Sequence, residues 1–391
     1  MKTLIISNYF PPEMGAASNR IFQMAKSFAN SNEGIEVACP FPNYPTGVIF
    51  PGYKGFYKLQ NVSDIKVHRF YIYANNSVSY LLRGFSMISF ALSLWLMLFK
   101  KSMRYERVII QNSPLLVSFS SIILFKFFLK SKVILNVSDL WPGSAVDLGV
   151  IKKGSLTHKV LLMIESFNYN NSDKIIGQSK LIIEHINKLT NKPTFIYRNL
   201  PVNDLFKVKS EKRKIKTFIY AGLLGVAQGV LSIVKIMSLT KNDFEFHIYG
   251  DGPEKNSIIH YLQVEQIKNI KYFGSIPKLE LQKILSSYYF AIVPLANDIK
   301  GAFPSKIYEL ILNRVPIIYI GCGEAKEVIE LNGLGFVVSP NNKESFIKVI
   351  NKSINLANEK YINIIKNQIH YGITNINYNF QFNKLKAFLD E

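Results

Sequence analysis

The segment around Lys306 places a cation and a carboxylate at the start of an expected helix. Pro304 favours a helix start, so we expect the helix over 305–313. Lys306 would lie at the helix end that already carries positive partial charge, which indicates an anion such as pyrophosphate bound between Lys306, Ser305 and free backbone N–H groups. Glu309 lies on the same face and can accept hydrogen bonds from a ribose diol. The alternative is a Lys306–Glu309 ion pair on a solvated helix.

Glycine-containing turns after expected strands supply further candidates for binding phosphate. Glycine between a strand and a helix permits close approach of the backbone to phosphate. Ligands of open α/β sheets bind at the carboxyl ends of the strands, where these turns lie. The candidates in the C-terminal half are Gly222, Gly225, Gln228, Gly250 and Gly252.

Short apolar strands alternate with helices along the chain, which is typical of a parallel α/β sheet. The first unit opens with a strand at 3–7, a polar loop that includes Gly15, and a helix with Ile21, Met24, Ala25 and Phe28 at helical spacing. Further strands are expected at 35–38, 108–110, 133–135, 174–176, 218–221, 246–249, 270–273, 290–293, 317–319 and 335–338. We predict two Rossmann-like domains that face a cleft, residues 1–200 and 201–391, separated by the charged stretch 207–216. The terminal helix is expected to pack back on the first domain.

The composition indicates a globular protein with a strong positive charge. The chain has 391 residues, two cysteines far apart in sequence and a formal net charge of +20. The cysteine count predicts neither a disulfide framework nor a metal site, and it favours a reducing cytoplasm. The charge indicates phosphorylated substrates or anionic lipid rather than nucleic acid, because no nucleic-acid-binding motif accompanies it. The charge is also consistent with simple compositional bias.

The apolar stretch 80–99 is followed by a basic run. Its length is close to what a membrane span needs, yet a span here would interrupt the chain path of the first sheet. We favour a helix that lies at the membrane interface, with a buried helix and a true span as the alternatives. The basic residues Lys100, Lys101, Arg104 and Arg107 would then contact anionic headgroups.

Taken together, the motifs resemble those of the retaining glycosyltransferases of family 4, which have the two-domain GT-B fold. The opening loop Tyr9–Glu13 with Gly15 looks like that family's first loop, which implies that Gly15 helps to bind the nucleotide sugar. Three further motifs match a subgroup of bacterial surface-polysaccharide transferases, similar to fucosamine and colanic-acid transferases: Asp139–Pro142, Gly250–Glu254, and Pro304–Lys306 with Glu309.

The resemblance implies that the first domain binds an acceptor and the second a nucleotide sugar. It implies a metal-independent transfer, without a cofactor, of a hexosyl or N-acetylhexosaminyl group. The donor would be UDP-linked, and N-acetylfucosamine or another deoxy or amino sugar would move with retention to a lipid-linked saccharide in O-antigen (lipopolysaccharide) or capsule biosynthesis. Lys306, Asp139 and Glu309 would be catalytic, with Asp139 contacting the acceptor or the donor sugar. The enzyme would be cytoplasmic and peripheral at the inner face of the membrane.

The sequence departs from the family's pattern at three places. Many members carry two glutamates eight positions apart, but here Gly301 stands at the first position and Glu309 at the second. Leu223 and Gln228 stand where many members have an arginine and a lysine. The negative charge of the phosphates would therefore be met mainly by Lys306 and the dipole of its helix. A nucleotide-sugar epimerase of the same fold and a non-catalytic membrane-binding protein are the alternatives, while the missing GxGxxG disfavours a dinucleotide dehydrogenase.

Overall fold

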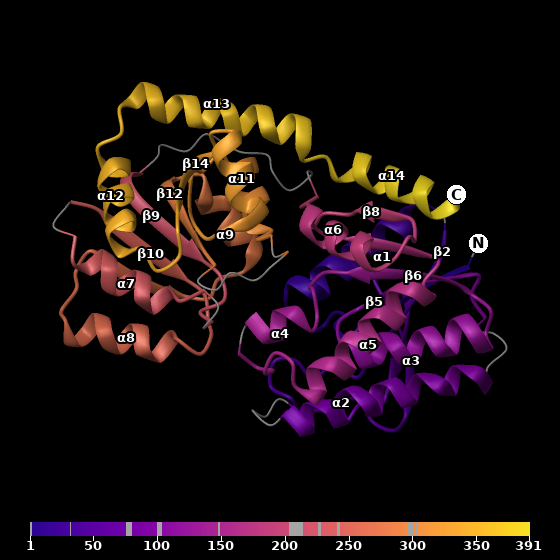
Figure 1. Ribbon diagram of the computed structural model, residues 1–391. Coiled ribbons are helices and arrows are strands. Elements are labelled where there is room, and N and C mark those ends of the chain that lie inside the picture. Colours follow the sequence, from indigo (N-terminus) through magenta and orange to yellow (C-terminus); the bar gives the residue numbers. More distant parts are fainter. Residues whose placement is uncertain are drawn as a thin grey trace. The chain divides into compact units, whose positions relative to one another are not determined.

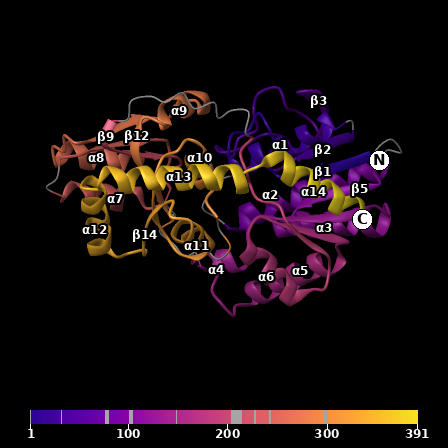
Figure 2. The same ribbon diagram turned by 90° about the horizontal axis from the view of Figure 1, so that it is seen from above.

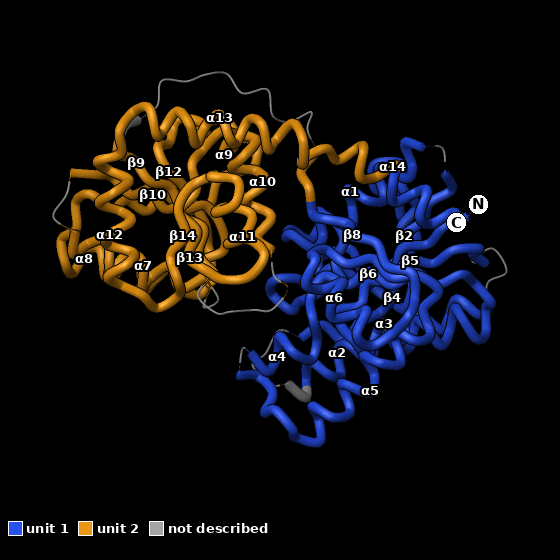
Figure 3. Tube along the Cα trace, turned by 45° about the horizontal axis from the view of Figure 1, so that its top comes forward, with its two compact units in different colours: residues 1–199, 384–391 blue, residues 200–383 orange. Residues whose placement is uncertain are grey.

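The chain folds into two compact units. The computed structural model describes residues 2–31, 33–75, 80–99, 104–147, 149–202, 214–225, 228–240, 243–295, 301 and 303–391 (Figure 1). Unit 1 comprises residues 1–199 and 384–391, and unit 2 comprises residues 200–383 (Figure 3). Most of the charged stretch 207–216 lies outside the described residues, as do Lys100 and Lys101.

Unit 1 is built on an eight-stranded sheet with the order β3-β4-β2-β1-β5-β6-β7-β8. The pairs are parallel except for β3 with β4, which are antiparallel. The strands are β1 (Lys2–Ile6), β2 (Gly34–Pro40), β3 (Tyr57–Val62), β4 (Ile65–Phe70), β5 (Arg107–Gln111), β6 (Lys132–Val137), β7 (Lys174–Gly177) and β8 (Thr194–Ile196). The strands predicted from apolar runs are confirmed, and β3, β4 and β8 were missed. Edge strand β3 is half exposed and polar, so it lacks the continuous apolar run of a buried parallel strand.

Helices cover both faces of this sheet. They are α1 (Ala16–Asn30), α2 (Tyr80–Ser93), η1 (Leu94–Phe99), α3 (Leu115–Ile122), η3 (Ile123–Phe128), α4 (Gly143–Asp147), α5 (Leu156–Asn171) and α6 (Lys180–Leu189). The predicted apolar face of α1 is buried. Helix α3 packs against both α2 and α5 (Figure 1). Phe90 and Leu94 are fully buried in the core with strand residues such as Ile110, so the stretch 80–99 is part of unit 1.

Unit 2 holds a six-stranded parallel sheet with the order β11-β10-β9-β12-β13-β14. The strands are β9 (Lys214–Ala221), β10 (Glu245–Tyr249), β11 (Ile270–Gly274), β12 (Tyr288–Pro294), β13 (Ile317–Ile320) and β14 (Gly335–Val338), which confirms every strand predicted in this half. The helices are α7 (Val230–Ser238), α8 (Lys255–Val264), α9 (Lys278–Leu285), α10 (Lys306–Leu312), α11 (Gly323–Leu331), α12 (Lys343–Ile354) and α13 (Asn358–Asn375). The chain leaves β9 in one direction and β12 in the other, so the sheet has a topological switch point between these two strands.

The last helix, α14 (Tyr378–Asp390), ends in unit 1 beside the end of α1 (Figure 2). Its final carbonyl groups accept hydrogen bonds from lysines of the sheet, Lys132 Nζ to Leu389 O at 3.2 Å and Lys174 Nζ to Phe388 O. Lysines at a helix C-terminus also interact favourably with its negative partial charge. These contacts join residues at the end of the chain to strands formed near its start.

Arg107 belongs to this junction and not to a membrane surface, so its expected contact with headgroups is wrong. The side chain is fully buried and forms ion pairs with Glu33 at 2.7 Å and Asp390 at 3.0 Å. Its Nε donates to Thr3 Oγ1 at 3.1 Å. The basic run in the sequence suggested that Arg107 is exposed, because the pairing of β5 with the distant Asp390 cannot be seen from neighbouring residues.

Candidate nucleotide site in unit 2

Lys306 lies at the switch point of the unit 2 sheet, against the turn that follows β9. A Cβ atom added to Gly222 would lie 1.5 Å from Lys306 Nζ, so the amine occupies the space that a side chain at this position would need. The ammonium also lies over the ring of Tyr220, 5.0 Å from its centre, which is a favourable cation–π distance. The fold thus brings together Gly222 and Lys306, two residues that were predicted separately as candidates for the nucleotide site.

The Lys306 amine is a cation without an ion-pair partner among the residues that the structure describes. Burial lowers its pKa to about 8, and the charge of Glu309 acts in the opposite direction. Removing an ammonium from water is costly unless a negative charge compensates it. A diphosphate is a group of the right charge for this position, at the sheet edge where α/β proteins bind ligands.

Helix α10 is shorter than expected. It begins at Lys306 and ends at Leu312, and the Ser305 side chain makes no capping hydrogen bond. A helix of seven residues has fewer aligned peptide dipoles than the nine-residue helix expected from the sequence. The electrostatic case for an anion therefore rests on the Lys306 amine more than on the helix end.

Glu309 forms its ion pair with Lys278 of α9, at 3.1 Å between Nζ and Oε1. The alternative prediction, an ion pair between Lys306 and Glu309 on a solvated helix, is therefore wrong, because Glu309 pairs with Lys278 and Lys306 is buried. Glu309 retains 23% exposure of its side chain and Lys278 retains 53%, so both groups are within reach of a ligand. Lys278 was not singled out from the sequence, although Pro277 before it marks the start of a helix.

Two of the predicted glycines serve contacts between turns. A Cβ at Gly250 would lie 1.8 Å from the carbonyl oxygen of Gly222, and a Cβ at Gly252 would lie 2.6 Å from that of Leu224. Backbone hydrogen bonds join the same turns, for example Leu224 N to Asp251 O at 2.9 Å. Gly250 and Gly252 therefore hold the turn beside Lys306 in place, which is a different use of glycine from direct approach to phosphate.

Gly225 and Gln228 form the end of the same turn. Gln228 N donates to Gly225 O at 3.0 Å, while Gln228 Oε1 is buried and has no hydrogen-bond partner among the described residues. Gln228 also lines a cavity of about 310 Å³ at the ends of β12, β13 and β14. Lys306 and Glu309 are not among the residues that line this cavity in the described part of the chain.

The remaining candidates, Gly15 and Asp139, lie in unit 1. Gly15 precedes α1, and its φ of +152° is a conformation that other residues rarely adopt. Glu13 of the same loop is buried and accepts hydrogen bonds from the backbone N–H groups of Asn43 and Tyr44, both at 2.9 Å. Asp139 follows β6 and is exposed. The first loop is therefore fixed by Glu13, whereas the Asp139 carboxylate is accessible.

The sequence and the structure were compared with those of known proteins. Residues 202–370 match the family model described as glycosyl transferases group 1. The chain is 26% identical over 296 residues to the probable glycosyltransferase WbjE of Pseudomonas aeruginosa, covering 71% of this chain and 73% of that protein. HepE of Anabaena, solved with UDP and glucose, superimposes with a TM-score of 0.72 at 13% identity, covering 100% of this chain and 99% of HepE. WaaG, a glycosyltransferase involved in lipopolysaccharide biosynthesis, gives 0.65 at 12% identity, with 97% of each chain covered.

The two parallel-sheet units are therefore those of the GT-B fold. The group 1 match covers most of unit 2, which contains Lys306 and Glu309, and it supports a glycosyltransferase with this fold.

Proposed function

We propose that the protein transfers a sugar from a nucleoside-diphosphate donor bound by unit 2 to a hydroxyl group of a lipid-linked saccharide held by unit 1. The acceptor oxygen forms a bond to the anomeric carbon while the bond from that carbon to the diphosphate breaks, and the proton of the acceptor hydroxyl passes to the departing diphosphate. The diphosphate leaves with the electron pair, so negative charge grows on it in the transition state. The observation that carries this proposal is the buried Lys306 amine against Gly222, which has no ion-pair partner among the described residues and is placed to stabilise that charge.

The finer assignments rest on the motifs and on similar proteins. Retention of configuration, and a deoxy or amino sugar such as N-acetylfucosamine as a hexosyl or N-acetylhexosaminyl group, follow from resemblance to the family 4 subgroup. UDP as the carrier is supported by the UDP bound in HepE. O-antigen or capsule biosynthesis is supported by WaaG and by the Asp139–Pro142 motif. We also propose that Lys306, and not a metal ion, meets the diphosphate charge, so transfer should persist in excess EDTA.

The proposed acceptor is membrane-bound, and unit 1 offers an apolar helix face for docking at the inner leaflet. The exposed apolar side chains of α2, η1, η3 and α5 that we assign to this face are Phe85, Ile88, Leu92, Leu96, Phe99, Phe127, Phe128, Leu156, Val160 and Met163. Ring contacts of Trp95 with Phe128 at 5.3 Å and of Phe127 with Phe167 at 6.5 Å connect η1, η3 and α5. In the described part of the chain, the segment Leu82–Phe99 alone is long and apolar enough to cross a membrane, but one side of it is packed into the unit 1 core.

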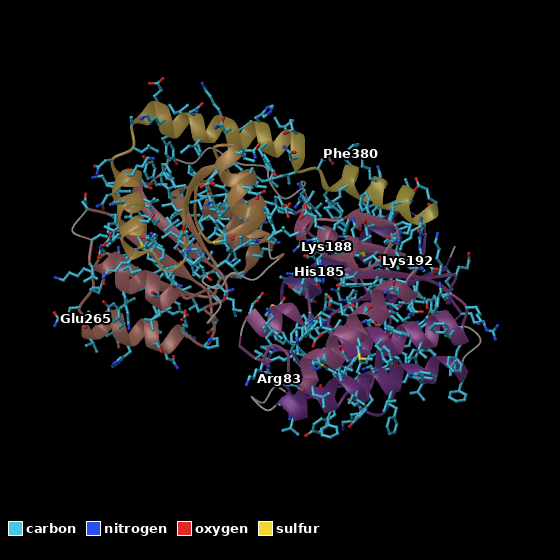
Figure 4. The ribbon with its side chains drawn as sticks, viewed as in Figure 1. Arg83, His185, Lys188, Lys192, Glu265 and Phe380 are labelled. Carbon is cyan, nitrogen blue, oxygen red and sulfur yellow. The ribbon has the colours of Figure 1, made fainter. Side chains whose placement is uncertain are left out.

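Exposed cations accompany the apolar helix face. Arg83 lies at the N-terminal end of α2 (Figure 4). Lys159 is exposed on α5 and follows Leu156 by three positions, so both lie on one side of that helix. Arg104 is exposed as well. These residues take the role that the sequence had assigned to Arg107, and they favour a surface that contains anionic lipid.

A panel of nucleotide sugars and nucleoside diphosphates, scored by ligand-observed NMR, tests the donor site. We expect binding of one nucleotide class to the wild type and its loss in Lys306→Ala, together with a fall in turnover of about 10²–10³-fold, as when one charge-stabilising donor is removed. Binding that Lys306→Ala leaves unchanged would contradict the proposal. Conversion of a nucleotide sugar without any acceptor would instead indicate an epimerase.

A further inference from the structure

Arg20 lies at the switch point of the unit 1 sheet, as Lys306 does in unit 2, but on the helix that follows β1, the first strand of its sheet. The unit 1 sheet has its own switch point, because the chain leaves β1 toward β2 and leaves β5 toward β6. The loop after β1 leads into α1 at this point, and Arg20 is in the second turn of α1. A switch point is where an open α/β sheet binds its ligand.

The guanidinium group of Arg20 is a cation without a counter-ion in the described part of the chain. Its Nε atom is buried and has no hydrogen-bond partner, and no carboxylate lies within ion-pair distance. The charges of Asp139 and Tyr197 act on it from a greater distance, and burial lowers its pKa to about 10. Arg20 therefore stays protonated at neutral pH. The residue as a whole is only half-buried, so a ligand can reach it.

Other polar atoms without partners lie at the same edge of the sheet. They are Asn8 Oδ1 in the loop after β1, Ser18 Oγ in the first turn of α1, and Gln178 Nε2 directly after β7. A buried polar atom without a hydrogen bond costs free energy, and such atoms in folded proteins call for an explanation. A bound ligand with oxygen atoms would satisfy Arg20 and Gln178 as donors, and its hydroxyl groups would satisfy Asn8.

We propose that Arg20 binds a phosphate group of the acceptor substrate. This inference rests on the proposed function, in which unit 1 holds a lipid-linked saccharide, and it adds that the phosphate linking lipid to sugar is recognised directly. Arginine suits this task because its planar group offers paired N–H donors to phosphate oxygens. The exposed carboxylate of Asp139, on the same side, is free to contact a sugar hydroxyl.

Inorganic pyrophosphate, titrated against the full chain, tests the site directly. The donor site also takes phosphate, so the titration is made in Lys306→Ala, with Lys306→Ala/Arg20→Gln compared against Lys306→Ala/Lys26→Gln. Lys26 is the matched control because it is an exposed cation on the same helix. We expect Arg20→Gln to weaken pyrophosphate binding at least tenfold and Lys26→Gln to leave it unchanged. Equal binding by the two double variants, or loss of all binding in Lys306→Ala alone, would overturn the proposal.

Thermal stability distinguishes a binding role from a structural one. An arginine kept for a ligand, with no ion-pair partner among the described residues, should leave the melting temperature unchanged or raised when it is replaced by glutamine. A marked fall in the melting temperature of Arg20→Gln would show that the residue supports the fold and would contradict the proposal. Asp139→Asn should tighten pyrophosphate binding, because it removes a negative charge near the site.

Steady-state kinetics separate the two possible sources of the phosphate. With an acceptor that carries a lipid pyrophosphate, Arg20→Gln should raise the acceptor KM tenfold or more and leave the donor KM unchanged. With an uncharged alkyl glycoside of the same saccharide, the variant should match the wild type. A rise in the donor KM instead would assign Arg20 to the donor diphosphate and overturn this proposal. If no nucleotide sugar binds at all, the proposed function fails, while the pyrophosphate titration still reports on Arg20.

Discussion

Lys306 is the residue whose chemistry depends most on its surroundings. An ordinary lysine loses its proton near pH 10.4, but burial brings the pKa of Lys306 to about 8. The amine of the unliganded protein therefore becomes neutral as pH rises through 8, and binding of a diphosphate must then include uptake of a proton. We expect affinity for a nucleoside diphosphate to be constant below this pH and to fall by up to tenfold per pH unit above it.

Calorimetric titrations from pH 6.5 to 9.5 check this prediction, with Lys306→Arg as the control. Arginine keeps its charge over the whole range, so its affinity should not change above pH 8. A decline of the same size in both proteins would mean that another group, on the protein or the ligand, sets the pH dependence.

Glu309 forms an ion pair with Lys278 in the unliganded protein, and a variant of Lys278 therefore provides a control for the role of Glu309 in binding ribose. If Glu309 binds ribose, Glu309→Gln should weaken binding of a nucleoside diphosphate by roughly 1–3 kcal/mol. The ion pair with Lys278 is half exposed and contributes at most about 1 kcal/mol to stability. Lys278→Gln should therefore leave nucleotide affinity unchanged or slightly improved, because it releases Glu309. If Glu309→Gln and Lys278→Gln weakened nucleotide binding equally, the loss of affinity would be due to the broken ion pair and not to a lost contact with ribose.

At the scale of elements, β5 and α14 are joined by a buried cation. Arg107→Gln would remove a charge that pairs with Glu33 and Asp390, although Glu33 keeps its second ion pair with Lys386, and loss of one partner from a buried ion pair costs about 3–5 kcal/mol. Urea unfolding should show a loss at or below this range, because Asp390 is 55% exposed. Arg104→Gln is the control, since Arg104 is exposed nearby in sequence and such changes stay within about 0.5 kcal/mol. Similar stability of the two variants would contradict the buried role of Arg107.

The apolar helix face of unit 1 makes the second prediction at this scale. Binding to liposomes should require anionic lipid and fall as salt rises, because each cation near such a surface contributes about 1 kcal/mol. Leu92→Asp and Met163→Asp, on α2 and α5, should each weaken binding. Leu331→Asp should not weaken binding, because this leucine, although more exposed than Leu92 and Met163, lies on α11 of unit 2.

Sedimentation with neutral and anionic vesicles, at low and high salt, measures this binding. Neutralising Lys100, Lys101 and Arg104 should reduce it, while activity on a short soluble acceptor persists. If no vesicle binds the wild type, the face has another use and the excess of basic residues is compositional.

For the molecule as a whole, the features that could be predicted from the sequence were those that depend on residues close together in the chain. Continuous apolar runs located the strands of both parallel sheets, and helical spacing located the buried face of α1. The sequence also selected Lys306 and the glycine turns that the fold brings to one edge. Contacts between distant segments were not predictable. No residue near Glu309 in the sequence indicates its ion pair with Lys278, and no residue near Arg107 indicates its ion pair with Asp390. Gly250 and Gly252 were predicted to bind phosphate. That they pack against the backbone of Gly222 and Leu224 could be seen only in the structure.

The return of residues 384–391 to unit 1 has a consequence for biosynthesis. On the ribosome, the strands of unit 1 emerge first, but Arg107, Lys132 and Lys174 meet their partners on α14 only after all of unit 2 has been translated. The nascent first unit therefore lacks the α14 carboxylate and carbonyl groups that these three side chains bind in the folded protein. Unit 2 can complete its fold from a continuous segment of chain, whereas unit 1 is finished last although it is begun first.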